Sequence, residues 1–544
     1  MKLKTYFNVA LLCLAVSLFA ACAGDNLADN NNEEKKQEIP QGVRFTINEP
    51  KTNAKSRVVI NEDGTVAAKT RTFITHTPGM GADAFWSDND YIWVKNNAGV
   101  WKKSIYTAIT TPDKKHATFI LPGKFSDYSD GCDVIYNMSQ PASSPLANNP
   151  EYLNIANLQP QNRANDFSDA GAWGDAGIGK AKLTGAPGEF VFQLAHGVSY
   201  LCLLPRCENA ALGQNIILKK VKVMGDHYLT ATFCNFAADG SVYIPSTPPT
   251  GVPSAMYGNI DSDVANFPLT NTTQDITKNG CYFIIVPGTY NFTITYTIKD
   301  KVTGIETNIE KKVNGVNCKA GEITDVTAWI DKDLKGNHTD YYLWGAQKPL
   351  TKSIDQLTPG DPQAANVANS IPNTLFSPLP NANELCWYAY KGDVHWGQSL
   401  DVYVVNGHLK HINGIWLKKK AKILADEHIS ASYMENGYPR FDNNQYKDWR
   451  NVYWEPGLPA AAYPQFLTIG TTPVPNTQDY FFLPFLGYNY LGFSIMGVDE
   501  YVNFWSSSTT SHLGVAWALY IYGHGVKVVS VPKNQSGYLV MPFQ

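Results

Sequence analysis

The sequence predicts a mainly β protein, with two antiparallel β-sandwich domains followed by a C-terminal α+β domain. The composition favours many-turned sheets over helical bundles, since 17% of the 544 residues are charged and 12% are aromatic, with 42 glycines and 32 prolines. Residues 290–298 alternate apolar and polar side chains, as a strand with one buried face does. Residues 504–543 form apolar runs around Gly523-His524-Gly525, which predicts a closing sheet with a hairpin turn. A chain of this length needs more than one core.

The N-terminus has the pattern of an export signal. Lys2 and Lys4 precede an apolar run, residues 9–21, which is too short to span a bilayer. The run ends in small residues before Cys22 and resembles a bacterial lipobox. We expect residues 1–21 to be a lipoprotein signal peptide, with a lipid on Cys22 that anchors the precursor in the cell outer membrane. The alternative is an ordinary signal peptide with an incidental cysteine.

Composition shifts divide the rest of the chain. Residues 22–40 are polar and acidic, which predicts a flexible tether. Residues 43–47 alternate and predict the first strand of a sandwich over 41–185. A Gly- and Pro-containing stretch near residue 185 predicts the start of a second sandwich, 186–331. Residues 332–380 are rich in Pro, Asn, Asp and Ser with isolated aromatic residues, which predicts a linker that is ordered in patches, and the C-terminal domain takes 381–544.

Several functional classes find no support in the sequence. The formal net charge is -4, so bulk electrostatics do not predict nucleic-acid binding. Beyond Cys22, the seven remaining cysteines are irregularly spaced without a CxxC pair, so neither a zinc site nor a redox pair is expected. Cys386 has the apolar surroundings of a strand. No GxSxG, HExxH or phosphate-loop motif occurs, so we expect no enzyme and no cofactor.

Residues 41–331, together with the N-terminal lipobox, resemble a known protein family. The pieces that carry the resemblance are the lipobox at Cys22, Thr70-Arg71-Thr72, and the runs 86–90, 192–196, 286–288 and 320–322. In this order they resemble the fimbrillin family, the lipoprotein-precursor pilins of Bacteroidales-type bacteria. The resemblance implies two transthyretin-like β-sandwich domains.

The resemblance also implies a mode of assembly. In this family a protease cuts after an arginine behind the first strand, and a strand from another pilus subunit fills the groove that is left (donor-strand complementation). The removable strand here would be residues 43–47, and the candidate cleavage residues are Arg57 and Arg71. Arg71 is better placed because it directly precedes an apolar run. Either one can instead be a plain surface arginine, and an anchor subunit would keep its first strand.

The C-terminal part resembles a second family. The runs 383–388, 414–420, 480–488 and 504–508 resemble the "major paralogous" domain of fibre-degrading bacteria, a variant of the C-type lectin-like fold. Calcium-dependent lectins use Glu-Pro-Asn and Trp-Asn-Asp runs as ligands. Here Glu455-Pro456-Gly457 lacks the Asn, and Trp505-Ser506-Ser507 lacks both Asn and Asp, so no calcium or other metal site is expected.

A recognition loop is expected over residues 442–464, which are both polar and aromatic. Exposed aromatic rings stack on sugar faces, while Asp, Asn and Glu bond hydroxyl groups. The candidate ligand-binding residues are Asp448, Trp449, Asn451, Tyr453, Trp454 and Glu455. Alternatively, Trp449 and Trp454 pack a small core within the loop.

Together these patterns predict a fimbrial (pilus) subunit at the cell surface, with a lectin-like head for cell adhesion that binds a host or plant glycan or a surface protein. The C-terminal module stands where polymerising fimbrillins carry their donor strand, which favours a tip adhesin. The alternative is a non-polymerising surface lipoprotein that captures glycans.

Overall fold

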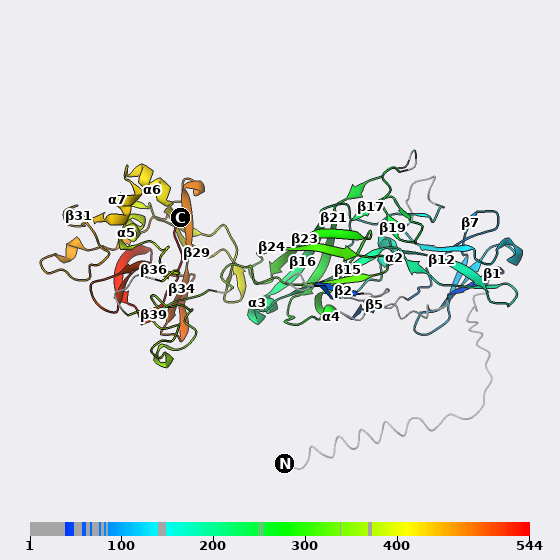
Figure 1. Ribbon diagram of the computed structural model, residues 1–544, viewed down its shortest axis with the longest axis horizontal. Helices are drawn as coiled ribbons and strands as arrows, with labels where there is room; N and C mark the ends of the chain where they lie inside the picture. Colours follow the sequence, from blue (N-terminus) through cyan, green and yellow to red (C-terminus); the bar gives the residue numbers. More distant parts are fainter. Residues whose placement is uncertain are drawn as a thin grey trace, which may run out of the picture. The chain divides into compact units, whose positions relative to one another are not determined.

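The computed structural model describes residues 39–47, 85–139, 148–248, 250, 252, 254–337, 339–367 and 373–544. It also gives the backbone of four short strands, β2 (Arg57–Ile60), β3 (Val66–Ala67), β4 (His76–Thr77) and β5 (Gly81–Ala82). Cys22 and Arg71 lie outside the described residues. Strands and sheets dominate the fold (Figure 1). Within this described part, no helix has the length and apolarity that crossing a membrane requires.

The first block is built on a nine-stranded sheet in the order β7-β6-β10-β12-β13-β1-β9-β8, with β14 pairing β12. Its strands are β1 (Val43–Ile47), β6 (Trp93–Lys95), β7 (Trp101–Lys103), β8 (Tyr106–Ile109), β9 (Ala117–Leu121), β10 (Asp133–Asn137), β12 (Ala176–Leu183), β13 (Glu189–Phe192) and β14 (Ala195–His196). A short 3-10 turn, η1 (Phe125–Asp127), lies beside them. The predicted first strand, residues 43–47, is confirmed as β1.

The second block has two larger sheets, β22-β15-β25-β2-β3 and β21-β16-β23-β24. Their strands are β15 (Ser199–Arg206), β16 (Ile216–Gly225), β21 (Asn259–Pro268), β22 (Cys281–Ile285), β23 (Gly288–Asp300), β24 (Glu306–Cys318) and β25 (Ile323–Trp329). Shorter elements are β11 (Tyr152–Leu153), β17 (Thr230–Ala231), β18 (Cys234–Phe236), β19 (Val242–Tyr243), β20 (Met256–Tyr257), α2 (Ala170–Trp173), α3 (Ala210–Asn215) and α4 (Ile276–Asn279).

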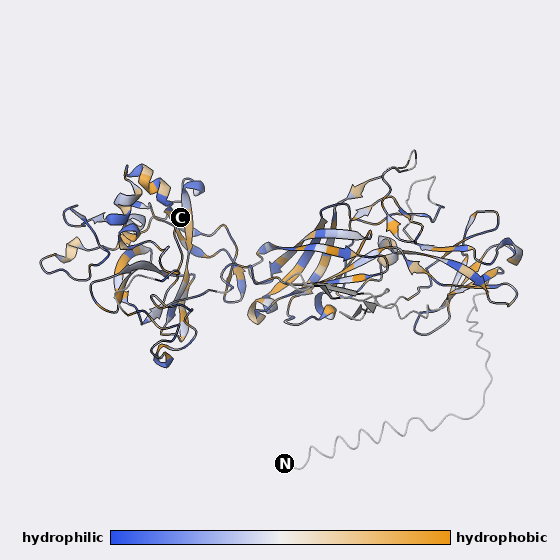
Figure 2. Cartoon of the chain, viewed as in Figure 1, coloured by the Kyte–Doolittle hydropathy of each residue, from blue (hydrophilic) through white to orange (hydrophobic). Residues whose placement is uncertain are grey.

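One hydrophobic core joins these two sheets. Leu201 and Phe283 come from one sheet, and Val221 and Ile294 come from the other. The alternation predicted for residues 290–298 is confirmed, because every second side chain of this part of β23 is buried. Polar and apolar residues alternate along the strands of this block in Figure 2. The transthyretin-like assignment stays a prediction.

The C-terminal block mixes helices with sheets. Its strands are β26 (His395–Gln398), β27 (Tyr403–Val405), β28 (His408–Lys410), β29 (Asn413–Lys418), β30 (Tyr438–Pro439), β31 (Tyr446–Lys447), β32 (Leu467–Thr468), β33 (Tyr480–Pro484), β34 (Leu486–Tyr490), β35 (Ser494–Val498), β36 (Val502–Thr509), β37 (Val515–Tyr522), β38 (Gly525–Pro532) and β39 (Ser536–Gly537). Its helices are α5 (Ala382–Lys391), α6 (Lys420–Asp426) and α7 (Ala431–Asn436), with 3-10 turns η2 (Ile354–Gln356), η3 (Ala460–Ala462) and η4 (Thr477–Asp479). The largest sheet has the order β32-β38-β37-β36-β34-β35, with β39 pairing β34. The C-type lectin-like assignment stays a prediction.

The predicted closing hairpin is confirmed. Strands β37 and β38 pair antiparallel from Val515 opposite Pro532 to Tyr522 opposite Gly525. The two turn residues, Gly523 and His524, both have positive φ (53° and 66°). This is the type I′ geometry whose twist matches that of the paired strands.

The strand environment expected for Cys386 is wrong, because this residue lies in helix α5. Asn381 caps the helix, since its side chain accepts the N–H of Asn383 and Glu384 while the Glu384 carboxylate accepts the N–H of Asn381. Such a capping box satisfies otherwise unpaired N–H groups of the first turn. The buried side chains of the helix, Leu385 and Tyr388 among them, face the main core of this block.

Some residues of the expected linker, 332–380, build the C-terminal core, and the domain bounds stay a prediction. Trp344 is fully buried, and its indole N–H donates to the carbonyl of Ser506 (2.9 Å). Tyr342 forms a β-bridge with Tyr538. Phe376 packs in the same hydrophobic cluster as Trp344. The Pro- and Asn-rich composition indicates that regular strands are rare here. Residues without regular secondary structure can still pack in a core, as Trp344 and Phe376 do.

The β27–β28 hairpin packs against the second block. Val404 and Leu409 belong to the hydrophobic core shared by its two sheets. Leu409 N–H donates to the Asp300 carboxylate (2.9 Å), and the Thr303 hydroxyl donates to the carbonyl of Leu409 (2.9 Å). The hairpin turn contributes as well, since the Asn215 amide donates to the carbonyl of Gly407 (2.9 Å).

A buried lysine in the C-terminal core gives a first testable prediction. Lys533 is fully buried, with Nζ 4.2 Å from the centre of the Trp344 ring. Burial lowers the pKa of Lys533 to about 8. Because the folded pKa lies below that of the unfolded chain, the folded state binds fewer protons above pH 8, and stability rises between about pH 8 and pH 10.4.

We expect Lys533→Met to raise the free energy of unfolding by about 1–3 kcal/mol at pH 7. The gain should shrink as the pH approaches 10, because the buried lysine of the folded wild type is then neutral and its burial no longer desolvates a charge. Denaturant unfolding at pH 7 and pH 10 measures both values. Lys527→Met, on β38, serves as a control. A Lys533→Met protein that is less stable at pH 7 contradicts the prediction.

Candidate binding sites

The first candidate site is the position of strand β1 within its sheet. β1 runs antiparallel to β9, with Phe45 opposite Phe119, and parallel to β13, with Phe45 opposite Phe190. Both neighbours have a further partner on their other side, since β9 pairs β8 and β13 pairs β12. β1 is therefore an internal strand, and its removal would leave two unpaired backbone edges facing each other.

The side chains of β1 alternate between the core and the surface. Val43, Phe45 and Ile47 are buried and belong to the hydrophobic core of the first block, whereas Arg44 is exposed. The Phe45 ring is stacked on Phe190 (centroids 4.7 Å apart, planes at 6°) and meets the edge of Tyr128 (5.4 Å, 73°). Burial raises the pKa of Tyr128 to about 12, and its hydroxyl donates to the carbonyl of Pro122 (2.7 Å). Without β1 this aromatic pocket would be open.

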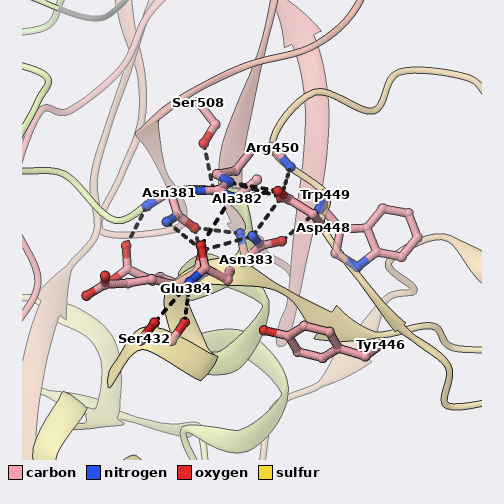
Figure 3. A network of polar contacts seen from close by, with 12 residues as sticks. Asn381, Ala382, Asn383, Glu384, Ser432, Tyr446, Asp448, Trp449, Arg450 and Ser508 are labelled. Atoms are coloured by element: carbon pink, nitrogen blue, oxygen red, sulfur yellow. Dashed lines mark hydrogen bonds and ion pairs between the residues drawn. The ribbon is translucent and has the colours of Figure 1, made fainter. Parts of the chain in front are cut away.

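The second candidate site is the loop predicted for recognition, residues 442–464. A polar network fixes its base to the start of helix α5 (Figure 3). The fully buried Asn383 amide donates to the Asp448 carboxylate (2.9 Å) and to the carbonyl of Glu435 (3.0 Å), and it accepts the N–H of Trp449 (2.8 Å). Ser508 extends the network by accepting the N–H of Ala382 (3.0 Å). The loop thus contains only the short strand β31 and the 3-10 turn η3, and its base is held by these hydrogen bonds.

Trp449 does not belong to an exposed recognition surface. Its side chain is fully buried, and its indole N–H donates to the carbonyl of Tyr438 (3.2 Å). It is part of the main core of the C-terminal block. The expectation that Trp449 contacts a ligand is therefore wrong, and Trp449 packs in the main core of the block instead of a small core within the loop.

The other aromatic candidates lie at the surface. Trp454 is 63% exposed and Tyr453 is 42% exposed. The Trp454 ring lies parallel to the ring of Tyr463 (centroids 6.0 Å apart, planes at 2°), and Tyr453 stacks on His512 (4.8 Å, 20°). These contacts hold both rings in place and leave much of each accessible. No sequence pattern pointed to Tyr463 or His512 as supporting residues.

The charged candidates form local ion pairs. Asp448 pairs with Arg450 (2.6 Å) and Glu455 pairs with Lys447 (2.5 Å). Burial raises the pKa of Asp448, but the hydrogen bonds from Arg450 and Asn383 outweigh it and leave that pKa lowered. Asn451 is exposed beside them. The exposed part of the loop therefore combines aromatic rings with ionised groups and an amide, which suits a hydroxyl-rich ligand.

Among the described residues, no side chains are arranged as ligands of a metal ion. None of their His, Cys, Asp and Glu side chains form a group of three or more that could hold a metal ion. The seven cysteines that the structure describes are all free and buried. Ser506, one of the residues that replace the lectin ligands, is also fully buried.

Comparisons with known proteins give distant structural similarities. No protein-family model and no curated protein matches the sequence. One similar solved structure, provisionally described as a cell adhesion protein of Bacteroides fragilis, is 10% identical (TM-score 0.26; 54% of this chain and 95% of that chain covered). The fimbrial anchor protein Mfa2 from Porphyromonas gingivalis is 10% identical (TM-score 0.20; 46% and 81% covered). A fimbrial protein from Bacteroides ovatus is 11% identical (TM-score 0.18; 92% and 98% covered). Similarity at this level assigns no activity or partner to this chain.

Proposed function

We propose that the protein is a fimbrial subunit that assembles by strand exchange at the position of β1. The observation that carries the proposal is the internal place of β1 between β9 and β13, with three core side chains on five residues. A groove of this kind, with two unpaired edges and an apolar floor, is a template for an added strand. The partner is a second pilus subunit that supplies a strand with apolar side chains at alternate positions.

Proteolytic removal of β1 is part of this proposal. Arg57 is the first residue of strand β2 and is paired with Ile323 of β25, so a cut there requires that strand to open. This supports Arg71 as the processing residue. Cys22 would carry the lipid of the precursor, at the outer membrane, before the cut.

N-terminal sequencing of protein from sheared pili tests this processing step. A start after Arg71 or Arg57 supports the proposal, whereas a lipid-blocked Cys22 with β1 retained points to an anchor subunit or to glycan capture without polymerisation.

The exchange itself can be tested on the purified protein. A protease site inserted after Ile47 would allow β1 to be cut from the chain. We expect a fluorescent peptide with the sequence of residues 41–48 to bind the cut protein and to be retained through gel filtration. The same peptide with aspartate in place of Phe45 should not bind, because an unpaired carboxylate would enter the aromatic pocket. Equal retention of both peptides would reject the groove as a specific strand acceptor.

We further propose that the C-terminal block is an adhesive head that binds glycans through the tip of the 442–464 loop. The exposed rings of Trp454 and Tyr453, with Asp448, Asn451 and Glu455 nearby in the sequence, support this proposal.

A glycan array with host and plant glycans is the direct test of the head. We expect Trp454→Ala to abolish most binding, because stacking of a sugar on the ring is lost, while thermal stability is unchanged. Tyr433→Ala is the matched control, since Tyr433 is an exposed aromatic residue of the same block, stacked on Tyr446 outside the loop tip. Binding that survives Trp454→Ala, or that falls equally in both variants, would refute the loop assignment.

A further inference from the structure

Residues 159–165 form a strap in the second block, and this strap borders a polar depression. The side-chain amides of Gln159 and Gln161 bond the edge strand β22 as a neighbouring strand would. Gln159 exchanges two hydrogen bonds with the backbone of Ile284 (2.8 and 2.9 Å), and Gln161 exchanges two with Tyr282 (3.0 and 3.2 Å). The backbone of Gln161 also bonds β21, because its N–H donates to the carbonyl of Asp263 (3.0 Å). The strap thus connects the two sheets of the block.

Beyond Gln161 the strap is fixed a second time. The N–H of Asn165 donates to the carbonyl of Gly280 (3.0 Å), and its side-chain oxygen accepts the hydroxyl of Tyr282 (2.5 Å). Arg163 lies between these two anchors, so its backbone is held on both sides. This matters for binding, because a preorganised residue loses less conformational entropy when a ligand arrives.

An open depression of about 420 Å³ lies between this strap, the end of β21 and helix α4. A volume of that order falls in the range of about 300–1,000 Å³ that small-molecule sites occupy. Its polar lining consists of Asn162, Arg163, Asn266, Thr270, Thr277 and Lys278. Alanine and proline side chains and Phe267 supply the apolar part of the wall.

The charge of the lining is positive. Neither Arg163 nor Lys278 forms an ion pair among the described residues, whereas nearby Lys220 pairs with Asp261 (3.0 Å). The neighbouring Asp275 is not part of the lining, and one of its carboxylate oxygens accepts the N–H and hydroxyl of Thr277 (3.1 and 2.5 Å). The oxygen of Asn266 accepts Lys219 Nζ (2.9 Å), which leaves the amide N–H₂ of Asn266 as a donor. Guanidinium, ammonium and amide groups together favour an anion that also carries hydroxyl groups.

We propose that this depression binds an acidic saccharide unit, a pyranose that carries a carboxylate or a sulfate. Arg163 and Lys278 neutralise the charge, the amides and hydroxyls bond the ring hydroxyls, and the apolar wall accepts the C–H face of the ring. The site lies in the second block, apart from the 442–464 loop, and does not depend on the proposed function of the head.

Calorimetric titration of the full chain tests the proposal with trigalacturonic acid, galactose-6-sulfate, neutral maltotriose and inorganic sulfate. We expect one or both acidic saccharides to bind at least 10-fold more tightly than maltotriose and inorganic sulfate. Binding of the two acidic probes also shows whether carboxylate or sulfate is preferred. The R163Q/K278Q double variant should weaken this binding at least 10-fold. Lys182→Gln is the matched control, because it removes an exposed lysine of the first block.

Three results would overturn the proposal: no binding of either acidic saccharide, binding that the double variant leaves unchanged, or inorganic sulfate that binds as tightly as the saccharides. The last result would mean a simple anion site. Trp454→Ala should leave binding of the acidic saccharides intact, so failure of the head proposal and failure of this one are distinguishable. Thermal unfolding of the double variant confirms that its fold is retained.

Discussion

Phe45→Ala is expected to lower the free energy of unfolding by about 3–5 kcal/mol. The ring is fully buried, stacks on Phe190 and meets the edge of Tyr128. Truncation removes the apolar area of the ring and leaves a cavity that the surrounding sheet fills only in part, because β1 is held by strands on both sides. Denaturant unfolding of the full chain, followed by tryptophan fluorescence, measures the loss.

Arg44→Ala is the matched control for this substitution. Arg44 lies on the same strand with its side chain exposed, so we expect a change within about 0.5 kcal/mol. A loss below about 1 kcal/mol for Phe45→Ala would mean that β1 does not fill the pocket in solution. Such a result would also remove the basis of the strand-exchange proposal, because the groove would then not depend on its occupant.

Strands with a strict alternation could be predicted from the sequence, and so could tight turns. Residues 290–298 and the β37–β38 hairpin lie where the pattern and the Gly-His-Gly run placed them. In both cases the signal is local, since the burial period and the turn geometry depend on adjacent residues. Helix α5 was missed because its short apolar run fits a strand and a helix equally, and the capping box of Asn381 and Glu384 was the overlooked signal.

The candidate site residues could also be predicted only where the signal is local. Trp449 and Trp454 stand five positions apart in one loop with similar neighbours, yet one is fully buried and the other is 63% exposed. The difference comes from Asn383, 66 residues earlier, which binds the N–H of Trp449 and fixes the loop base on α5. A contact of that sequence separation leaves no trace in local composition. The partners of Phe45 in the β1 pocket, Tyr128 and Phe190, are likewise distant in sequence.

Asp300→Ala should lower the free energy of unfolding by about 3–5 kcal/mol. The Asp300 carboxylate is fully buried at the point where the β27–β28 hairpin packs on the second block. It accepts the N–H groups of Val302 (2.8 Å), Thr303 (2.9 Å) and Leu409 (2.9 Å), and it lies 3.1 Å from Nδ1 of His408. Alanine would leave these donors buried without an acceptor. Asp333→Asn, which changes an exposed partner of Lys311, should cost less than about 1 kcal/mol.

The same carboxylate predicts a pH dependence with a definite sign. Burial raises the pKa of Asp300, but the hydrogen bonds from Thr303, Leu409 and Val302 outweigh it, so the pKa is lowered in the folded protein. A carboxyl with a lowered folded pKa stabilises the fold above its unfolded pKa of about 3.9, and the contribution is lost as the pH falls through the folded value. The stability difference between the wild type and Asp300→Asn should therefore shrink as the pH falls from 5 through 4 and below. A difference that stays constant down to pH 2 would show that the pKa of Asp300 is the same in the folded and the unfolded protein, so that these hydrogen bonds do not favour the ionised carboxylate.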